Sequence, residues 1–544
     1  MSTSDDMGTS SQSNLALTLV QKKNWIGLFL LVAGISIAGL IYLGGATYTG
    51  APPLVKYTNA SGETVISREL IKRGDTVFHL RGLMAYGSFW GDGAERGPDF
   101  TADALHRTVM HMRDFYGNEI KQDRALTQFD QDAIEARVIR EVHTNTFDAE
   151  ADLIRLNDAQ IYAYRELNNH FTRMFMDPDY PELFMTGYIT DPADIQALTA
   201  FFYWGGWVAA ANRPGETYSY THNWPFDPAA GNGPTFATYI WSILSILALF
   251  LGIGAVLYIY GQMKELPGDT FTTDGTSLTT NDLENQYVRP TQRATYKFFV
   301  LAILLFGAQV LAGIISATDF IRPMGIFLGE YIPYTVSRSY HTLFQIMWFF
   351  MCWVGYTIFF LPRLSKVPSG QKFLINLLFV MCLGVGVGSL VGIHLGMTGV
   401  LTGDTAYWFG SQGWEFMSMG RAFQLLLLAS FALWIVIIYR GVKPWLTKKN
   451  LWSVPAWLLY GSGIMVMFLF FGLLVTPETN FAIADYWRWM VVHMWVEVTF
   501  EVFTTVIVGY MLVQMGLISR LMAERVIFLA VMLFLITATI GISH

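Results

Sequence analysis

The chain has 544 residues, 53% of them hydrophobic, with a formal net charge of −7 and a mean hydropathy of +0.37. A soluble protein of this length would not be so apolar, so the composition indicates an integral membrane protein in a lipid bilayer. The acidic balance argues against nucleic acid as a partner, because a nucleic-acid-binding surface is basic and clustered. The two cysteines form no CxxC or CxxCH motif, which leaves zinc ribbons, cysteine-ligated iron–sulfur clusters and covalent c-type haem unsupported.

The first part of the chain predicts a membrane anchor followed by a soluble domain. Residues 1–23 are polar and rich in Ser and Thr, and we expect them to be disordered and cytoplasmic. The apolar run over 24–45 is too long for a signal-peptide core and has no clear cleavage site, which favours an uncleaved anchor. From 46 to 236 the composition changes to that of a soluble domain, rich in Asp, Arg, Asn and Gly.

The remaining residues, 237–544, predict a bundle of membrane-spanning helices. A last apolar run begins near 524 and is still apolar at 540, so about nine spans are expected with the anchor. The predicted fold class is therefore mostly α, a polytopic helix bundle with an inserted soluble domain. The other seven runs lie at about 237–261, 295–318, 337–361, 371–395, 417–440, 453–476 and 486–513.

Basic residues decide the predicted orientation, because they occupy every second link between spans. By the positive-inside rule these links are cytoplasmic, so the domain over 46–236 is expected on the extracytoplasmic side. The basic positions are Lys22, Lys23, the segment 289–297, Arg363, Lys366, Lys372, Arg440, Lys443, Lys448, Lys449, Arg520 and Arg525.

The span over 486–513 carries side chains that lipid does not tolerate. His493, Glu497 and Glu501 stand at i, i+4 and i+8, so they project from one face of a helix. Ionisable residues inside a span are costly and usually face a bundle interior or a cofactor, which favours metal or proton chemistry. The alternative is a buried polar stripe that joins helices through hydrogen bonds.

Three histidines on three spans lie at one predicted depth, near the extracytoplasmic side. They are His341, His493 and His544. Neutral imidazole binds haem iron, non-haem iron and copper, so their agreement in depth predicts a buried metal site. Each one alone would more often be a hydrogen-bonded packing residue, which is our interpretation of His394.

The sequence stops at His544 directly after an apolar run. A membrane helix normally ends with an interfacial anchor and a soluble flank. We therefore expect this chain to be a C-terminally truncated fragment, with further spans and ligands missing.

Three longer motifs lie in the membrane part: VVHMWVE at 491–497, RSYHTLFQIMW at 338–348 and GSQGWEFMSMGRAFQ at 410–424. They resemble the VVHLWVEG signature, the RxWHxQLxIFW helix and the GHQGWEYLELGRxWQ segment of nitric oxide reductases, a branch of the haem–copper oxidase superfamily. The soluble domain resembles that of the single-chain, quinol-dependent form, whose cytochrome c-like fold lacks haem c. It does so at 82–87, 97–103, 156–160 and 217–225.

The resemblance implies a role for each motif residue. His341 matches the ligand of the low-spin haem b. His493 and His544 match ligands of a non-haem iron, and Glu497 matches its carboxylate neighbour or ligand. Glu415 matches a calcium-binding glutamate. The ligand of the active-site haem, of b3 type, would lie beyond the last residue.

The carboxylates Glu497 and Glu501 would act in catalysis as a proton relay or as an electrostatic adjustment. The resemblance also implies nitric oxide as substrate and the bacterial cytoplasmic membrane as location, and it is compatible with a homodimer.

One departure from the family pattern bears on the chemistry. The quinol-dependent reductases carry a His-x-x-x-Glu quinol site before the haem b helix, whereas the stretch 315–325 here contains only Asp319. Quinol binding is therefore doubtful, since quinol hydroxyls need a proton acceptor. A second change is Val498, which replaces the Gly of the reductase signature.

The loss of the quinol-site residues on an otherwise preserved scaffold resembles the pattern of the nitric oxide dismutases, which convert two NO into N2 and O2. The sequence therefore predicts this reaction. The alternative is a nitric oxide reductase that forms N2O with quinol at an altered site or with a soluble donor. A third reading, from another class, is a transporter or proton channel without a redox centre.

Overall fold

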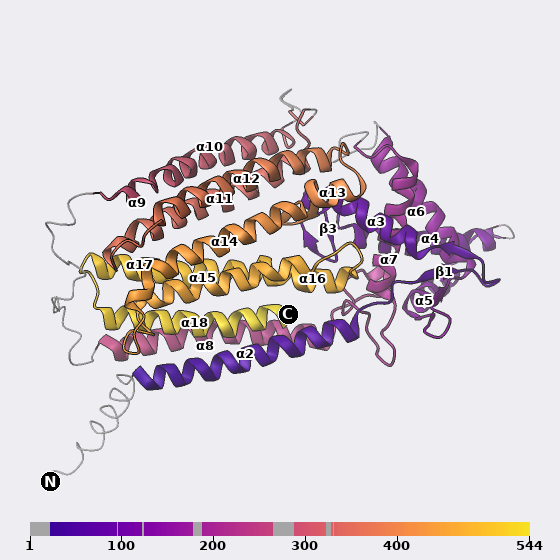
Figure 1. The fold of residues 1–544 in the computed structure, drawn as a ribbon. Coiled ribbons are helices and arrows are strands. Elements are labelled where there is room, and N and C mark those ends of the chain that lie inside the picture. The colour runs from indigo at the N-terminus through magenta and orange to yellow at the C-terminus, as the bar shows by residue number, and fades with distance from the viewer. Residues whose placement is uncertain are drawn as a thin grey trace, which may run out of the picture.

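The computed structural model describes residues 22–94, 96–121, 124–177, 188–264, 288–321, 328–329 and 331–543. Long helices run side by side, and a smaller mixed domain caps one end of this bundle (Figure 1). Within the described part of the chain, nine helices are long and apolar enough to cross a membrane, as expected. The predicted fold class is confirmed. The N-terminal stretch 1–21 lies outside the described residues, and Lys22 and Lys23 already belong to the first helix.

The membrane part is built from the apolar runs that the sequence shows. Its helices are α2 (Lys22–Gly50), α8 (Phe236–Lys264), α9 (Pro290–Arg293), α10 (Tyr296–Thr318), α11 (Tyr334–Phe360), α12 (Gln371–Met397), α14 (Arg421–Val442), α15 (Val454–Phe471), α16 (Phe481–Trp489), α17 (Thr504–Gln514) and α18 (Arg520–Ser543). Two π-helical segments, η8 (Met490–Trp495) and η9 (Val498–Phe503), join α16 to α17 as one continuous crossing.

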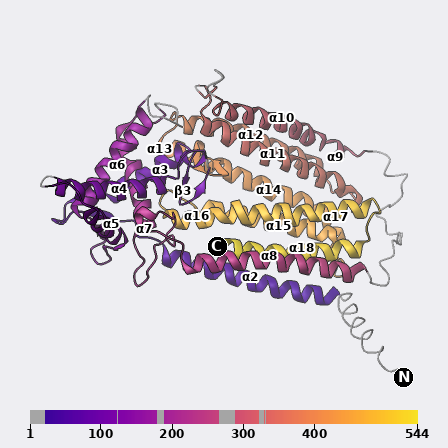
Figure 2. The same cartoon turned by 180° about the vertical axis from the view of Figure 1, so that it is seen from behind.

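The first and last described helices pack against each other, although they are far apart in sequence. The ribbons of α2, α8 and α18 run along the same edge of the bundle (Figures 1 and 2), and α2 contacts α18. The hydroxyl of Ser36 donates to the carbonyl of Leu535 at 3.0 Å. This contact fixes the last helix against the bundle.

The capping domain combines helices with a small sheet. The helices are α3 (Arg68–Leu80), α4 (Phe100–Lys121), α5 (Gln128–His143), α6 (Asp158–Met176) and α7 (Pro192–Ala210). The sheet has the order β2-β1-β6-β5, from β1 (Lys56–Thr58), β2 (Thr64–Ile66), β5 (Phe147–Asp148) and β6 (Leu153–Arg155), with β1 and β6 parallel. A short hairpin, β3 (Ser88–Phe89) and β4 (Asp92–Gly93), faces the bundle end.

Stacked aromatic rings form the core of this domain, around α7. Phe89 stacks on Phe201 at 4.4 Å between ring centroids, and Phe100 stacks on Phe202 at 4.5 Å. Full burial of a phenylalanine contributes about 1.5–3 kcal/mol, so these rings dominate the packing.

A β-hairpin replaces the start of one predicted span. We expected a span over 417–440, but β7 (Ser411–Trp414) pairs with β8 (Met417–Met419), and the helix begins only at Arg421. The short helix α13 (Gly403–Phe409) precedes the hairpin. Gly413 has φ +63°, and a Cβ there would lie 1.5 Å from the carbonyl oxygen of His79 in α3. Only glycine allows this contact, and the hairpin thereby packs directly on the capping domain.

Candidate metal centre

The helix that carries the predicted polar stripe is π-helical where the stripe begins and ends. His493 lies in η8 and Glu501 in η9, with Glu497 between the two segments. π-helical turns bond i to i+5, are rare and occur mostly at functional sites. A π-helix has more residues per turn than an α-helix, so residues four positions apart lie almost directly above one another. The three side chains therefore stay on the same face of the helix.

His493 and Glu497 come together as expected. Nε2 of His493 lies 3.3 Å from Oε1 of Glu497, and the two side chains are only 24% and 20% exposed. Nε2 of His493 and Oε2 of Glu497 are buried and form no hydrogen bond with the described part of the chain. Leaving a buried polar atom unpaired costs about 1–3 kcal/mol, and few such atoms occur in folded proteins.

These two atoms fit a metal ligand set. An imidazole nitrogen and a carboxylate oxygen are donors that iron accepts, and neither atom is hydrogen-bonded to another described residue. Across the residues that the structure describes, no group of three or more His, Cys, Asp or Glu side chains is arranged to hold a metal ion. The predicted third ligand, His544, lies outside the described residues.

Helix α18 reaches the imidazole of His493 with its backbone. A Cβ on Gly541 would lie 2.2 Å from Nε2 of His493, so a side chain at this position would force the imidazole to move. Gly541 precedes His544 by three residues, which is about one turn of a helix. The last helix therefore runs against the ring that the sequence assigns to iron.

Glu501 differs from the other two residues of the stripe. Its side chain is exposed on the bundle, one turn beyond Glu497. Its role in proton relay stays a prediction.

His341 is held separately, between α11 and α10. Its Nδ1 lies 2.9 Å from the carbonyl oxygen of Gln309. A carbonyl only accepts, so Nδ1 carries the proton and Nε2 keeps a free lone pair. A second ring nitrogen fixed by a backbone carbonyl is the usual arrangement of a metal-binding histidine, and it fits the predicted haem b ligand.

Glu415 lies in the hairpin between β7 and β8 and is bound by arginine. Nη1 of Arg338 donates to its Oε1 at 2.6 Å, and Nε of Arg488 donates to its backbone oxygen at 3.2 Å. Burial raises the pKa of the Glu415 carboxyl, and the Arg338 guanidinium opposes this shift. The carboxylate is thus already paired with a cation, and its assignment to calcium stays a prediction.

Sequence reasoning missed this arginine cluster, which joins both histidine-bearing helices. Arg338 precedes His341 by one helical turn, and Arg488 lies five residues before His493. Arg488 is only 1% exposed and pairs with Asp92 of the capping domain and with Asp485. An arginine inside an apolar span was the signal that could have found it, since such residues are rare and usually paired.

The stretch in which the sequence analysis looked for a quinol site carries an ion pair with the capping domain. Nη2 of Arg96 lies 3.1 Å from Oδ2 of Asp319, and their side chains are 13% and 5% exposed. The Arg96 guanidinium also lies over the ring of Phe320, at 4.4 Å from its centroid. Residues 322–327 of this stretch lie outside the described residues.

Comparison with known proteins gives two family matches in chain order. Residues 55–226 match the family model of the cytochrome c-like domain of NorB, a subunit of nitric oxide reductase. Residues 293–544 match that of the cytochrome C and quinol oxidase polypeptide I. The first match covers most of the capping domain, and the second covers α10 to the end of α18.

A curated relative agrees with these matches. The chain is 27% identical over 258 residues to the NorB subunit of nitric oxide reductase from Stutzerimonas stutzeri, which covers 46% of this chain and 52% of the relative. The match thus extends over about half the length of that relative.

Proposed function

We propose that this chain, a nitric oxide reductase-like protein of the haem–copper oxidase family, converts two molecules of nitric oxide into dinitrogen and dioxygen inside the membrane. The substrate follows from the similarity to the NorB subunit of nitric oxide reductase. The reaction balances without outside electrons or protons, since 2 NO give N2 and O2.

The observation that carries the choice of reaction is the ion pair between Arg96 and Asp319. A quinol site needs an acceptor for the hydroxyl protons, and here the one carboxylate of the stretch is neutralised by a guanidinium. Phe320 covers the same guanidinium. This segment is therefore poorly suited to receive and oxidise a quinol, and a reaction without net electron supply does not require one.

Two sets of residues would hold the redox groups. His493, Glu497 and His544 would hold the non-haem iron, and His341 would hold the low-spin haem b. When bound, iron would supply redox chemistry and a binding place for nitric oxide, so that two substrate molecules would meet in one site.

The protein residues prepare this site in three ways. The Gln309 carbonyl keeps the Nε2 lone pair of His341 available. The Glu497 carboxylate, 3.3 Å from His493, supplies a negative charge that balances a bound cation. Gly541 lets α18 approach the His493 ring without a clash.

Nitric oxide reduction to N2O is the second candidate. It is favoured by the activity of the curated relative and by Glu497 and Glu501, which lie one turn apart and could pass the two protons that this reaction consumes. The side chain of Glu501 is exposed at the surface of the described bundle.

Anaerobic incubation of the purified protein with 15N-labelled nitric oxide distinguishes the two reactions. Labelled N2 with O2, formed without added reductant, is the expected result. Labelled N2O that forms only with added quinol would reject dismutation and support the reductase. An absorption spectrum without a haem Soret band would reject both reactions and leave a transporter or channel.

A further inference from the structure

Polar contacts join α11 to the helices that precede it along one shared edge. Near one end, the Ser316 hydroxyl donates to that of Ser337 at 2.9 Å. Near the other, Nε2 of Gln292 in α9 donates to the carbonyl of Phe359 at 3.1 Å. The last residues of α10 thus meet the first residues of α11, so the two helices run antiparallel.

Between these ends, Gln309 of α10 bonds to α11 at two levels. Its carbonyl oxygen accepts from Nδ1 of His341 at 2.9 Å, and its side-chain Oε1 accepts from Nε1 of Trp348 at 2.6 Å. His341 and Trp348 are seven residues apart, which is about two turns of a helix. An indole N–H only donates, so its partner must be the amide oxygen, and this fixes the orientation of the Gln309 amide.

The geometry of a helix explains how one residue reaches both levels. Helical carbonyls point toward the C-terminal end, whereas side chains lean toward the N-terminal end. In an antiparallel neighbour, these two directions lead to residues that are separated along the chain. The carbonyl of Gln309 therefore meets His341, and its side chain meets Trp348.

Gly313 gives the imidazole of His341 room against α10. A Cβ on Gly313 would lie 2.9 Å from Nδ1 and 3.0 Å from Cε1 of that ring. Gly313 follows Gln309 by four residues, so both lie on the same face of the helix. The ring of His341 is thus in contact with the α10 backbone at the nitrogen that donates to Gln309.

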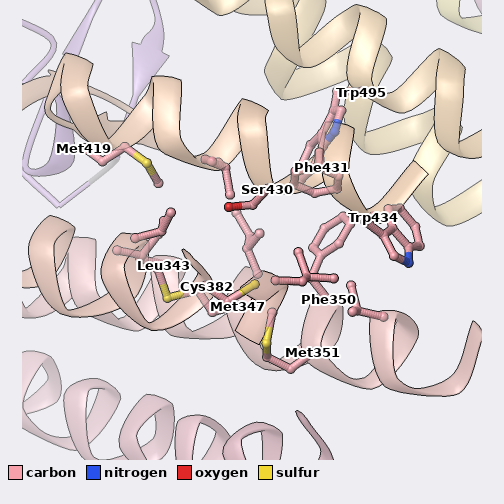
Figure 3. Close-up of a pocket in the computed structure, with 15 residues that line it drawn as sticks. Leu343, Met347, Phe350, Met351, Cys382, Met419, Ser430, Phe431, Trp434 and Trp495 are labelled. Carbon is pink, nitrogen blue, oxygen red and sulfur yellow. The ribbon is translucent and has the colours of Figure 1, made fainter. Parts of the chain in front are cut away.

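The other side of this segment of α11 is apolar. Leu343 and Met347 line a pocket of about 80 Å³ against α12 and α14 (Figure 3). Apolar contacts have no preferred direction, so they do not fix the height of a helix along its neighbour. From His341 to Trp348, Gln309 supplies both hydrogen bonds that join the described segment to another helix.

A hydrogen bond from Nδ1 affects what Nε2 of the same ring can do. It fixes the tautomer and the plane of the imidazole, and it makes Nε2 a stronger electron donor. Hydrogen bonding around an axial ligand is one of the means by which a protein sets the potential of a haem. A stronger donor favours the oxidised iron and lowers that potential.

We propose that Gln309 is a positioning residue for the haem b ligand His341. Its carbonyl orients the imidazole, and its side-chain bond to Trp348 holds α11 at the height where this contact is made. The proposal rests on the proposed function, since that function assigns His341 to haem b.

Gln309→Met tests the side-chain bond, because methionine has a similar length but is only a weak acceptor. The contact between His341 and the carbonyl is expected to loosen. The midpoint potential of haem b should then rise, and the low-spin ferric haem signal in electron paramagnetic resonance should shift. An unchanged potential and an unchanged signal would overturn the proposal.

Ser316→Ala is the matched control, because it removes the bond to Ser337 from the same pair of helices. The potential and the resonance signal of haem b should stay as in the unchanged protein. The same shift in Ser316→Ala as in Gln309→Met would mean that any loosening of α10 has this effect, and it would overturn the specific role of Gln309.

Trp348→Phe covers the case in which Gln309→Met does not fold. It removes the donor and keeps an aromatic ring, so the potential and the signal should move in the same direction. The double variant Gln309→Met/Trp348→Phe should shift them no further than one substitution does, since both remove one bond. Additive shifts would show that the two side chains act separately and would contradict the proposal.

The contact at Gly313 gives an independent test on the same helix. Gly313→Ala is expected to displace the ring and to change the haem b signal. Gly307→Ala is its control, because a Cβ there would meet no described atom within 4 Å. Equal signals in the two variants would show that the ring does not lie against α10, which would overturn the proposal.

These measurements need no nitric oxide, so they are independent of the reaction that the protein catalyses. The shift in Gln309→Met would support the positioning role even if the gas assay rejected dismutation. A low-spin haem signal retained in His341→Ala would instead remove the ligand assignment, and the positioning role would fall with it.

Discussion

The ring of His341 carries its proton on Nδ1, because that nitrogen faces the carbonyl oxygen of Gln309. The buried Nε2 of His493 lies beside a carboxylate instead. A fixed tautomer with one free lone pair suits an axial haem ligand, whereas an imidazole next to a carboxylate suits a mixed ligand set on a single iron. The two histidines are therefore expected to hold different centres.

His493→Ala is expected to abolish the non-haem iron and leave the low-spin haem b in place. His341→Ala is expected to do the reverse. Iron content and the haem absorption spectrum of each purified variant measure the two centres. A variant that retained both centres would show that its histidine is not a ligand.

Asp319→Asn is expected to destabilise the protein because it leaves the Arg96 guanidinium buried without its counter-charge. Loss of one partner of a buried ion pair costs about 3–5 kcal/mol. The free energy of unfolding in denaturant measures this change. Removing both charges, in Arg96→Gln/Asp319→Asn, should restore part of the stability, and an effect equal to the sum of both single variants would mean that the two charges do not interact.

At the level of elements, the contact between α18 and η8 depends on the absence of a side chain. A Cβ added to Gly541 would meet Nε2 of His493. A Cβ added to Gly509 on α17 would lie 3.9 Å from side-chain carbons of Ala523 and Ile527, which is an ordinary van der Waals distance. The same substitution therefore has different consequences at the two positions.

Gly541→Ala is expected to push the imidazole of His493 away and to lower iron content several-fold, because its Cβ would come within 2.2 Å of Nε2. Gly509→Ala is the control and should retain iron. Metal analysis and the haem spectrum of both variants give the measurement. Equal iron content in the two would show that the α18 backbone does not constrain the ring.

The π-helical segments were not predictable from the periodicity of the sequence. The spacing of His493, Glu497 and Glu501 indicated a shared face for an α-helix, and a π-helix shares that face as well. Hydropathy predicted a crossing over 486–513, whereas the apolar helix in the structure runs over Phe481–Gln514. The hydrogen-bonding pattern within it does not follow from hydropathy.

At the level of the whole molecule, the stability of the capping domain is expected to depend on pH, because some of its carboxyl groups have lowered pKa values. A bidentate Arg124 at 2.6 and 2.7 Å, together with the backbone and hydroxyl of Thr127, holds the pKa of Asp130 well below its usual range. The pKa of Asp103 is also lowered, against burial, by bonds from His170 and Arg107.

A carboxylate with a lowered folded-state pKa contributes stability above its unfolded pKa of about 3.9 and loses it as the pH falls further. The capping domain is therefore expected to lose stability in acid from about pH 4 downward. Asp130→Asn should lower stability at neutral pH and weaken this acid dependence, as measured by circular dichroism during acid titration. Asp132→Asn, an exposed position on the same helix, is the control. An unchanged acid profile in Asp130→Asn would contradict the prediction.

The sequence by itself determined the soluble insertion, the polar stripe and the spans, except for the start of the span predicted over 417–440, because each is a local pattern of hydropathy or spacing. It also indicated His341, His493 and Glu497 as candidate ligands, since their motifs are short and continuous. Only the tertiary structure decided which buried charges meet: Arg96 pairs with Asp319 across 223 residues, and Arg338 pairs with Glu415 across 77. Such pairs form because the folded chain removes both charges from water together, and no single segment of sequence contains that information.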